Sequence, residues 1–373
     1  MQTFKCSCGN RLFFENSVCH QCGKETGFVP QLMLMVDIAP AEKQRWASEQ
    51  VPDERFRKCH NYLQHNTCNW LIPASDTSEY CLACRLNTVI PNLNKPGNLT
   101  RWYRLERAKR RTLYNLYRIG LQVSSKQEQP DKGLEFCFKE DVKKYDPYNQ
   151  ELVTYEHIMT GHDTGTITIN IEEADHAILE AVRENMNEPY RTTLGHFRHE
   201  IGHYYWDRLI ANSSQVESFR AQFGDERHDY QANLRRYYQQ GPSPDWQDNF
   251  ISAYASAHPW EDWAESWAHY LHITDTMETA YDFGFIIEGR AIPKPSTVKD
   301  TSVYNSSIYL RTISFDEMLT DWLRLTIAMN ALNRSMGLRD AYPFSVSAKV
   351  GDKLRYVHNL IASSLDKSSF QTN

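Results

Sequence analysis

Residues 193–207 read TLGHFRHEIGHYYWD and contain the pattern H-E-x-x-H. Two histidines four residues apart, His199 and His203, project from the same side of a helix, close enough to bind one metal ion. Glu200 follows the first histidine and reaches the edge of that site, where it can take a proton from a water molecule on the metal. The stretch therefore predicts a helix that carries a catalytic zinc site.

A helical wheel separates the two faces of this predicted helix. One face gathers the histidines and acids, which are His196, His199, Glu200, His203 and Asp207. The other face is apolar or aromatic and holds Leu194, Phe197, Ile201, Tyr204, Tyr205 and Leu209. An isolated histidine is more often a satisfied core or surface residue than a ligand, but three histidines and two acids on one face favour a zinc site.

A second helix is predicted where residues 254–272 read YASAHPWEDWAESWAHYLH, because Pro259 suits the first turn of a helix. One face of this helix holds Glu261, Glu265, His269 and His272, and the other holds Trp260, Trp263, Trp267 and Tyr270. The two further histidines, His269 and His272, favour a buried polar face directed at the metal over plain solvent exposure. A catalytic zinc needs a third protein ligand, and the candidates are Glu261, Asp262, Glu265, His258 and His269. Spacing alone does not choose between the two glutamates, but the helix dipole favours a carboxylate in the first turn.

Eight of the nine cysteines lie in the first 84 residues, in C-x-C and C-x-x-C pairs that are typical of metal sites in a reducing compartment. The first set predicts a zinc ribbon formed by Cys6, Cys8, Cys19 and Cys22. The second set is Cys59, Cys68, Cys81 and Cys84, with His60 or His65 as alternatives to one of the more widely spaced cysteines. Four protein ligands leave no open position on zinc, so both sites are expected to be structural. Cys137 stands alone and is expected to be a buried strand residue.

The rest of the chain is expected to combine many helices with a small sheet, in the α+β class. Strands are predicted at residues 133–139 and 165–171, and helices at 315–336 and 353–365. A further helix at residues 101–118 carries seven basic residues and one acidic residue. Its basic side is either an ordinary solvated face or a docking surface for an acidic partner or RNA.

The 373-residue chain has a formal net charge of -6 and a pI near 6.2, which argues against broad binding to nucleic acid. No run approaches the roughly 18 apolar residues that a membrane span needs. The first residues show no apolar segment of a secretory signal. We therefore expect a cytoplasmic protein that does not contact a membrane.

The sequence resembles the bacterial family of zinc-binding metallopeptidases that carry an N-terminal zinc ribbon. The matching stretches run almost the length of the chain, at residues 68–70, 81–87, 160–162, 188–192, 195–200, 253–255, 258–265 and 333–337. The H-E-x-x-H pattern followed by Glu261-x-x-x-Glu265 also resembles the gluzincin branch of the zincins. The resemblance implies a zinc-ribbon module over residues 1–97, with sites at 4–24 and 59–84, and a zincin-like metallopeptidase domain over residues 98–373.

Residue by residue, the resemblance implies that His199, His203 and Glu261 bind zinc and that Glu200 is the general base. Glu265 takes the place of the acid that orients a ligand histidine. Tyr254 takes the place of the tyrosine that some relatives aim at the developing oxyanion, with Tyr204, Tyr230 and His228 as alternatives. The predicted strand at residues 165–171 takes the place of an edge strand that pairs with an extended peptide.

These observations predict a zinc-dependent hydrolase of peptide or amide bonds, with one catalytic and two structural zinc ions. Its expected partner is a peptide or protein substrate. The alternative is a zinc-ribbon module that binds protein or nucleic acid and carries a latent or inactive zincin domain. The intact H-E-x-x-H pattern argues against that alternative, because binding alone needs no general base at Glu200.

Overall fold

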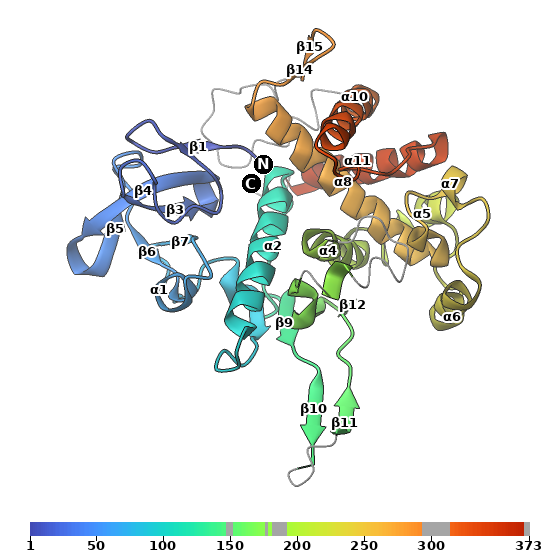
Figure 1. The fold of residues 1–373 in the computed structure, drawn as a ribbon, viewed down its shortest axis with the longest axis horizontal. Coiled ribbons are helices and arrows are strands. Elements are labelled where there is room, and N and C mark those ends of the chain that lie inside the picture. Colours follow the sequence, from blue (N-terminus) through green and yellow to red (C-terminus); the bar gives the residue numbers. More distant parts are fainter. Residues whose placement is uncertain (147–151, 176–177, 181–191, 293–313, 369–373) are drawn as a thin grey trace. The chain divides into compact units, whose positions relative to one another are not determined.

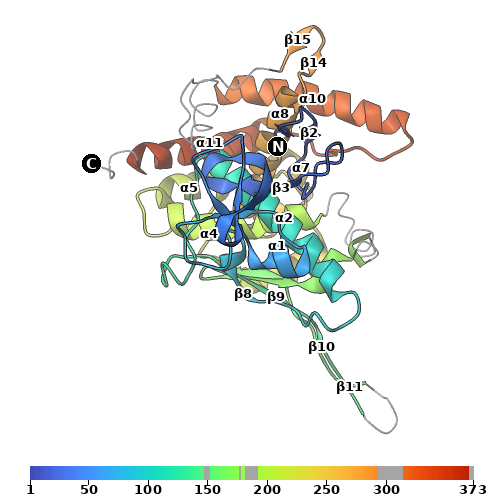
Figure 2. The same ribbon diagram turned by 90° about the vertical axis from the view of Figure 1, so that its left-hand side faces the viewer.

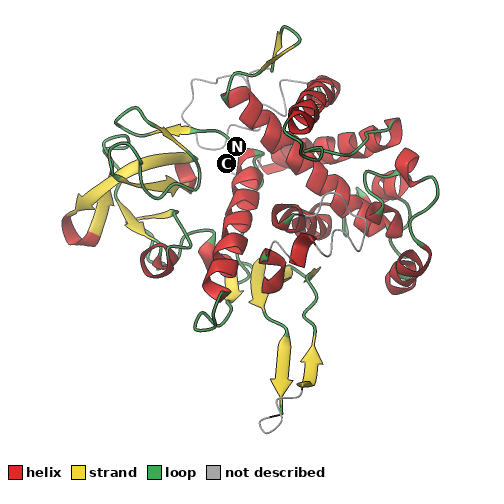
Figure 3. Cartoon of the chain, viewed as in Figure 1, coloured by secondary structure: helices red, strands yellow, loops and turns green. Residues whose placement is uncertain are grey.

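The computed structural model describes residues 1–146, 152–175, 178–180, 192–292 and 314–368. Helices and several sheets share the chain, which confirms the expected α+β class (Figure 3). The chain forms two compact units, and the division falls within one helix, between Tyr114 and Asn115. One unit holds Gln2–Tyr114 and Val123–Val182, and the other holds Met1, Asn115–Gln122 and Arg183–Asn373.

The N-terminal part of the first unit is a small antiparallel β structure. A hairpin of β1 (Phe4–Lys5) and β2 (Arg11–Leu12) precedes a five-stranded sheet of β3 (Glu25–Val29), β4 (Leu34–Ala41), β5 (Arg45–Ala47), β6 (Phe56–Lys58) and β7 (Leu71–Pro73), paired in that order. The short helix α1 (His60–His65) connects β6 to β7. Phe28 and Trp70 are fully buried with their rings 5.1 Å apart, so aromatic packing supplies the core of this part.

The same unit holds a second sheet of four strands, in the order β12 (Gly161–Asp163), β13 (Thr166–Asn170), β9 (Glu135–Lys139) and β8 (Asn87–Val89). Figure 2 shows the hairpin of β10 (Val142–Tyr145) and β11 (Leu152–Glu156) extending from this sheet. Helix α2 (Asn98–Arg118) is the predicted basic helix, and Cys137 is buried in β9 as expected. The predicted edge strand is wrong, because β13 lies inside the sheet: it pairs with β9 along its whole length and with β12 over residues 166–168.

The other unit consists mainly of helices (Figure 1). The most extensive contact between elements of this unit joins α4 (Thr193–Leu209) to α8 (Pro259–Asp282). The remaining elements are α5 (Val216–Phe223), α6 (Tyr230–Gln240), α7 (Trp246–Asn249), the 3-10 turn η5 (Tyr254–Ala257), the hairpin of β14 (Ile286–Ile287) and β15 (Arg290–Ala291), α10 (Phe315–Ser335) and α11 (Ala348–Ser368). None of the helices in the described part of the chain is long and apolar enough to cross a membrane.

Local sequence explains where α4 and α8 begin. The Thr192 hydroxyl accepts a hydrogen bond from the Gly195 amide at 2.9 Å and caps α4. The His258 ring does the same for α8, where Nδ1 accepts from the Trp260 amide at 3.1 Å and Pro259 occupies the first turn. The middle of α8 is buried on nearly all sides, so this helix forms the core of the unit and positions its polar residues inside it.

Candidate metal centre

Helices α4 and α8 bring three metal-binding side chains together. His199 and His203 come from α4 and Glu261 from the first turn of α8, and their nearest ligand atoms all lie within 4.8 Å of one another. The two histidine Nε2 atoms are 3.2 Å apart. Oε2 of Glu261 lies 3.0 Å from Nε2 of His199, and Oε1 lies 3.6 Å from Nε2 of His203.

These separations fit a zinc ion. Tetrahedral bonds of 2.0–2.1 Å place neighbouring ligand atoms about 3.3 Å apart. All three residues are buried, and Oε2 of Glu261 accepts no hydrogen bond. A buried carboxylate oxygen without a hydrogen bond is costly unless a positive charge lies next to it. The three donors therefore suit a divalent cation. Among the described residues of this unit, no other three metal-binding side chains lie close enough together to hold one.

The electrostatics of the cluster also favour a cation. Burial alone would lower the pKa of His199, but hydrogen bonds and charges from Glu261 and Glu265 raise it well above its ordinary value. Burial would raise the pKa of Glu261, yet the two histidines hold it well below its ordinary value. Two carboxylates buried this close to the imidazoles favour positive charge at this position, which a divalent cation would supply.

Glu265 lies one turn after Glu261 and contacts His199 on the other side of its ring. Oε1 of Glu265 is 2.7 Å from Nδ1 of His199, and Oε2 accepts a hydrogen bond from the Ser252 hydroxyl at 2.6 Å. A carboxylate accepts only, so Nδ1 carries the proton and Nε2 is left for a metal. Burial would raise the pKa of Glu265, but the bond to His199 lowers it to about 2. The structure thus gives Glu265 the contact that the sequence interpretation assigned to it.

Glu200 is buried beside the cluster, with 7% of its surface exposed. Burial raises the pKa of its carboxyl group above the ordinary value, and the charges of His199, His203 and His196 oppose this shift. A carboxylate with a raised pKa is a better proton acceptor near neutral pH.

Two tyrosines lie against the cluster. The ring of Tyr254 in η5 is 6.0 Å from the ring of His199. The Tyr230 hydroxyl donates to Oε1 of Glu261 at 2.6 Å, so it is already engaged with a ligand residue. Of the other two alternatives, Tyr204 is buried and His228 is exposed. The contact of Tyr230 with Glu261 joins residues 31 positions apart, and no sequence pattern indicated it.

The remaining acid and histidine candidates have other partners. Asp262 pairs with Nζ of Lys353 at 2.6 Å, and His269 Nδ1 lies 2.7 Å from the Tyr342 hydroxyl. His272 Nδ1 lies 2.6 Å from a guanidinium nitrogen of Arg198, and His258 caps α8. The sequence interpretation that directed His269 and His272 at the metal is therefore wrong, because both complete buried hydrogen bonds to neighbouring helices and loops.

Trp260 also lies where the helical wheel did not place it. Its ring is 4.5 Å from the ring of His203 and 6.0 Å from that of Tyr230, so it packs against the metal cluster. A helical wheel shows only the direction of each Cα, and the long side chain of Trp260 reaches beyond that direction. The aromatic face of α8 therefore begins at Trp263, which is fully buried.

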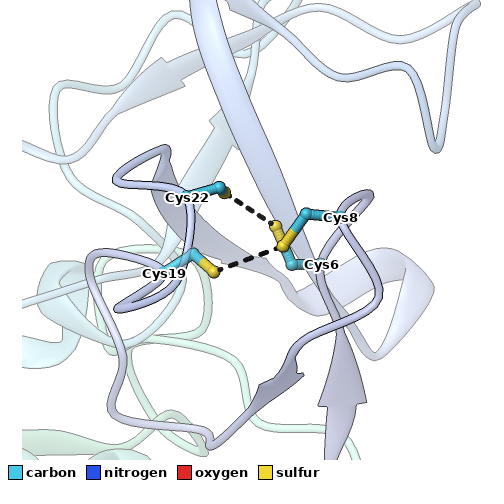
Figure 4. Close-up of side chains that lie close together, drawn as sticks. All are labelled: Cys6, Cys8, Cys19 and Cys22. Carbon is cyan, nitrogen blue, oxygen red and sulfur yellow. Dashed lines mark hydrogen bonds between the residues drawn. The ribbon is translucent and has the colours of Figure 1, made fainter.

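The first four cysteines form a compact cluster in two turns (Figure 4). The sulfur atoms of Cys6 and Cys22 are 3.6 Å apart and those of Cys8 and Cys19 are 3.7 Å apart. Tetrahedral zinc–sulfur bonds of 2.3 Å place the sulfurs about 3.8 Å apart. Gly9 and Gly23 adopt positive φ angles of 87° and 74° and close the two turns, a conformation that other residues rarely adopt. Cys8 and Cys22 are exposed.

The second cluster consists of sulfur atoms alone. Cys59, Cys68, Cys81 and Cys84 are all buried, their sulfurs lie within 4.8 Å of one another, and neither His60 nor His65 belongs to the group. The ring of His60 packs on Tyr80 and that of His65 on Trp102, at 5.4 and 5.7 Å. The nine cysteines all lie among the described residues and all are free of disulfide bonds.

The basic residues of α2 mostly have partners within the protein. Lys109 pairs with Glu106 at 2.8 Å, and Arg110 donates to the carbonyl oxygen of Thr67. Salt bridges or carbonyl contacts likewise engage Arg101, Arg104, Arg111 and Arg118. Arg107 is exposed. Six of the seven basic residues of α2 therefore have contacts within the protein.

Comparison with known proteins relates the chain to one family. A family model described as "Putative zinc-binding metallo-peptidase" matches residues 98–360, and a model of a zinc-ribbon domain matches residues 3–95. Proteins of Mycobacterium bovis and Mycobacterium tuberculosis, named only as uncharacterized, are 38% identical over 363 residues, which cover 97% of this chain and 95% of theirs. No solved structure matches the chain.

Proposed function

Because this chain belongs to the family of putative zinc-binding metallo-peptidases, we propose that it hydrolyses peptide or amide bonds at a zinc ion held by His199, His203 and Glu261. The observation that carries the proposal is the convergence of three buried donor atoms from α4 and α8 beside the buried carboxyl group of Glu200. Three protein ligands leave a fourth position for water or substrate, as catalytic zinc sites require.

A zinc ion bound there would polarise the scissile carbonyl group and activate a water molecule. Glu200 accepts the proton of that water and passes it to the leaving amine, a role supported by its burial and raised pKa. Glu265 fixes the proton of His199 on Nδ1, and Ser252 fixes Glu265. Tyr254, beside His199, donates a hydrogen bond to the oxygen on which negative charge develops.

The remaining assignments follow from the same proposal. The metallopeptidase domain is zincin-like and of the gluzincin type, and each cysteine cluster holds one structural zinc, so the chain carries three zinc ions in all. The substrate is a peptide or protein, and the enzyme acts in the cytoplasm without binding a membrane or nucleic acid. The two sulfur clusters and the pattern of internal partners along α2 support these assignments.

The test compares cleavage of a proteome-derived peptide library by the wild type and by Glu200→Gln, read by mass spectrometry. The variant should keep three zinc ions and lose most turnover, since it removes the proton acceptor and leaves the ligands in place. Glu217→Gln is the matched control, because Glu217 lies on α5 with 84% of its side chain exposed. Equal cleavage by the wild type and Glu200→Gln would show that the mechanism is wrong.

A further inference from the structure

The two carboxylate oxygens of Glu261 have different neighbours. Oε1 accepts the short hydrogen bond from the Tyr230 hydroxyl, at 2.6 Å. Oε2 accepts no hydrogen bond and lies 3.0 Å from Nε2 of His199. The carboxylate is 1% exposed, so solvent does not compete for either oxygen.

Tyr230 is held in place by the same residues that begin α8. It is the first residue of α6, which the Asp229 side chain caps through the Ala232 amide at 2.9 Å. Its ring packs edge-on against His258 and Trp260, at 5.2 and 6.0 Å between ring centroids. Nε2 of His258 also lies 3.1 Å from the carbonyl oxygen of His228, which ties the chain just before α6 to the start of α8.

A hydroxyl bonded to one carboxylate oxygen changes how that carboxylate binds a metal. The charge-assisted hydrogen bond takes up lone-pair density on Oε1, so Oε2 becomes the better donor to zinc. Binding through one oxygen keeps zinc at three protein ligand atoms, whereas binding through both oxygens would fill the position that water or substrate needs.

We infer that Tyr230 is a positioning residue for the metal centre: its hydroxyl holds Glu261 so that Oε2 alone binds the metal and the fourth coordination position stays open. The inference rests on the proposed function, since it requires a metal ion at His199, His203 and Glu261. It also assigns α6 a role, because this helix has no buried residue among those described and reaches the cluster through its first side chain.

The experiment uses the full-length protein, with Tyr230→Phe as the variant and Tyr238→Phe as the matched control. Tyr238 lies on the same helix with 60% of its surface exposed. Each protein is depleted of metal at the His199 cluster by a mild chelator, and cobalt(II) and zinc are titrated back. A His199→Ala variant treated in the same way gives the blank, so that the difference spectrum excludes cobalt at the cysteine clusters.

Wild type and Tyr238→Phe should give the strong visible absorption of four-coordinate cobalt. Tyr230→Phe should give the weaker absorption of a five-coordinate ion and bind metal roughly 10–100-fold more weakly. Tyr230→His retains a ring donor and should fall between the two. Thermal unfolding of the metal-depleted proteins separates a folding defect from a metal defect, and Tyr230→His provides the comparison if Tyr230→Phe does not fold.

Wild-type affinity and an unchanged spectrum in Tyr230→Phe would overturn the inference while leaving the metal site intact. If Tyr230→Phe does not fold, a folded Tyr230→His with wild-type affinity and an unchanged spectrum would overturn it in the same way. If the wild type itself takes up no more cobalt than the His199→Ala blank, the metal centre fails, and with it the proposed function. The two failures are therefore distinguishable.

Discussion

The indole Nε1 of Trp263 donates a hydrogen bond to the carbonyl oxygen of Gly202 at 2.8 Å, with the tryptophan fully buried. The bond joins α8 to α4 one residue before His203 and two residues after Glu261. At the same contact, a Cβ added to Gly202 would lie 3.0 Å from Cα of Ala264 and 3.2 Å from Cβ of Trp267. The absence of a side chain at Gly202 thus sets the separation of the two helices that carry the metal ligands.

Gly202→Ala should push α8 away from α4, because the new methyl group would meet backbone that cannot rotate aside. Overpacking of this kind costs about 1–3 kcal/mol, and the better helix propensity of alanine returns at most about 1 kcal/mol. Urea unfolding measures the loss of stability, and zinc content measures whether the ligands on the two helices still meet. Gly351→Ala on α11 is the control, since its Cβ would lie an ordinary 3.6 Å from Leu319, and it should not destabilise the protein.

The two glutamates one turn apart on α8 should respond differently to alanine. Glu261→Ala should lose the metal of the His199 cluster, because it removes one of three converging donors. Glu265→Ala should keep the metal with roughly 10–100-fold lower affinity or activity, because it removes only the partner of Nδ1 of His199. Zinc titration of the two variants measures the difference, and the opposite order would show that the ligand assignment is wrong.

Replacing Cys19 and Cys22 together by serine should reduce the zinc content from three ions to two. Zinc binding at such sites is coupled to folding and provides about 10–16 kcal/mol, so the ribbon should unfold without its ion. Elemental analysis and limited proteolysis of the N-terminal residues measure both effects. Cys137→Ala is the control, because Cys137 lies in β9 outside both clusters and should leave all three ions in place.

Arg110→Gln should loosen the second cysteine cluster. Arg110 is buried, and the charges of Cys68, Cys81, Cys84 and Glu106 raise the pKa of its guanidinium against the effect of burial. Removing this cation leaves only Lys109 as a buried cation beside Glu106 and the cysteine cluster, at a cost of up to about 3–5 kcal/mol. The expected result is faster zinc loss to a chelator together with lower stability in urea.

Arg111→Gln provides the matched control for that experiment. Arg111 is the next residue on α2 and pairs with Glu15, but 38% of its side chain is exposed. Such a partly exposed pair contributes about 0–1 kcal/mol. Equal zinc loss from the Arg110 and Arg111 variants would contradict the role given to Arg110.

Local pattern predicted the parts of the structure that depend on a single helix or turn. The spacing of His199 and His203 gave the ligand face of α4, Pro259 gave the first turn of α8, and the cysteine pairs gave two four-sulfur clusters. In each case the residues concerned lie close together in the sequence, in one helix or in neighbouring turns. A stretch of about 20 residues is therefore enough to predict that they meet.

Features that depend on distant neighbours were not predictable in this way. A helical wheel gives the direction of His269 around α8 but not the element that its side chain meets there, and it placed Trp260 away from the metal cluster on which that ring packs. The pairing of β13 on both sides depends on β12 and β9, and the contact of Tyr230 with Glu261 depends on how α6 approaches α8. The internal partners of the basic residues on α2 were not predictable, because acidic partners such as Glu15 and Glu278 are far away in the sequence.

The two cysteine clusters differ in the exposure of their residues, with Cys8 and Cys22 exposed and all four members of the second cluster buried. A chelator or oxidant must first reach a sulfur, so ions at the two clusters would exchange on different timescales. A pulse of isotopically labelled zinc should enter the ribbon first and the buried cluster only when that region opens. Stored protein would then become a mixture in which ribbon zinc is missing from some molecules while the buried zinc is retained.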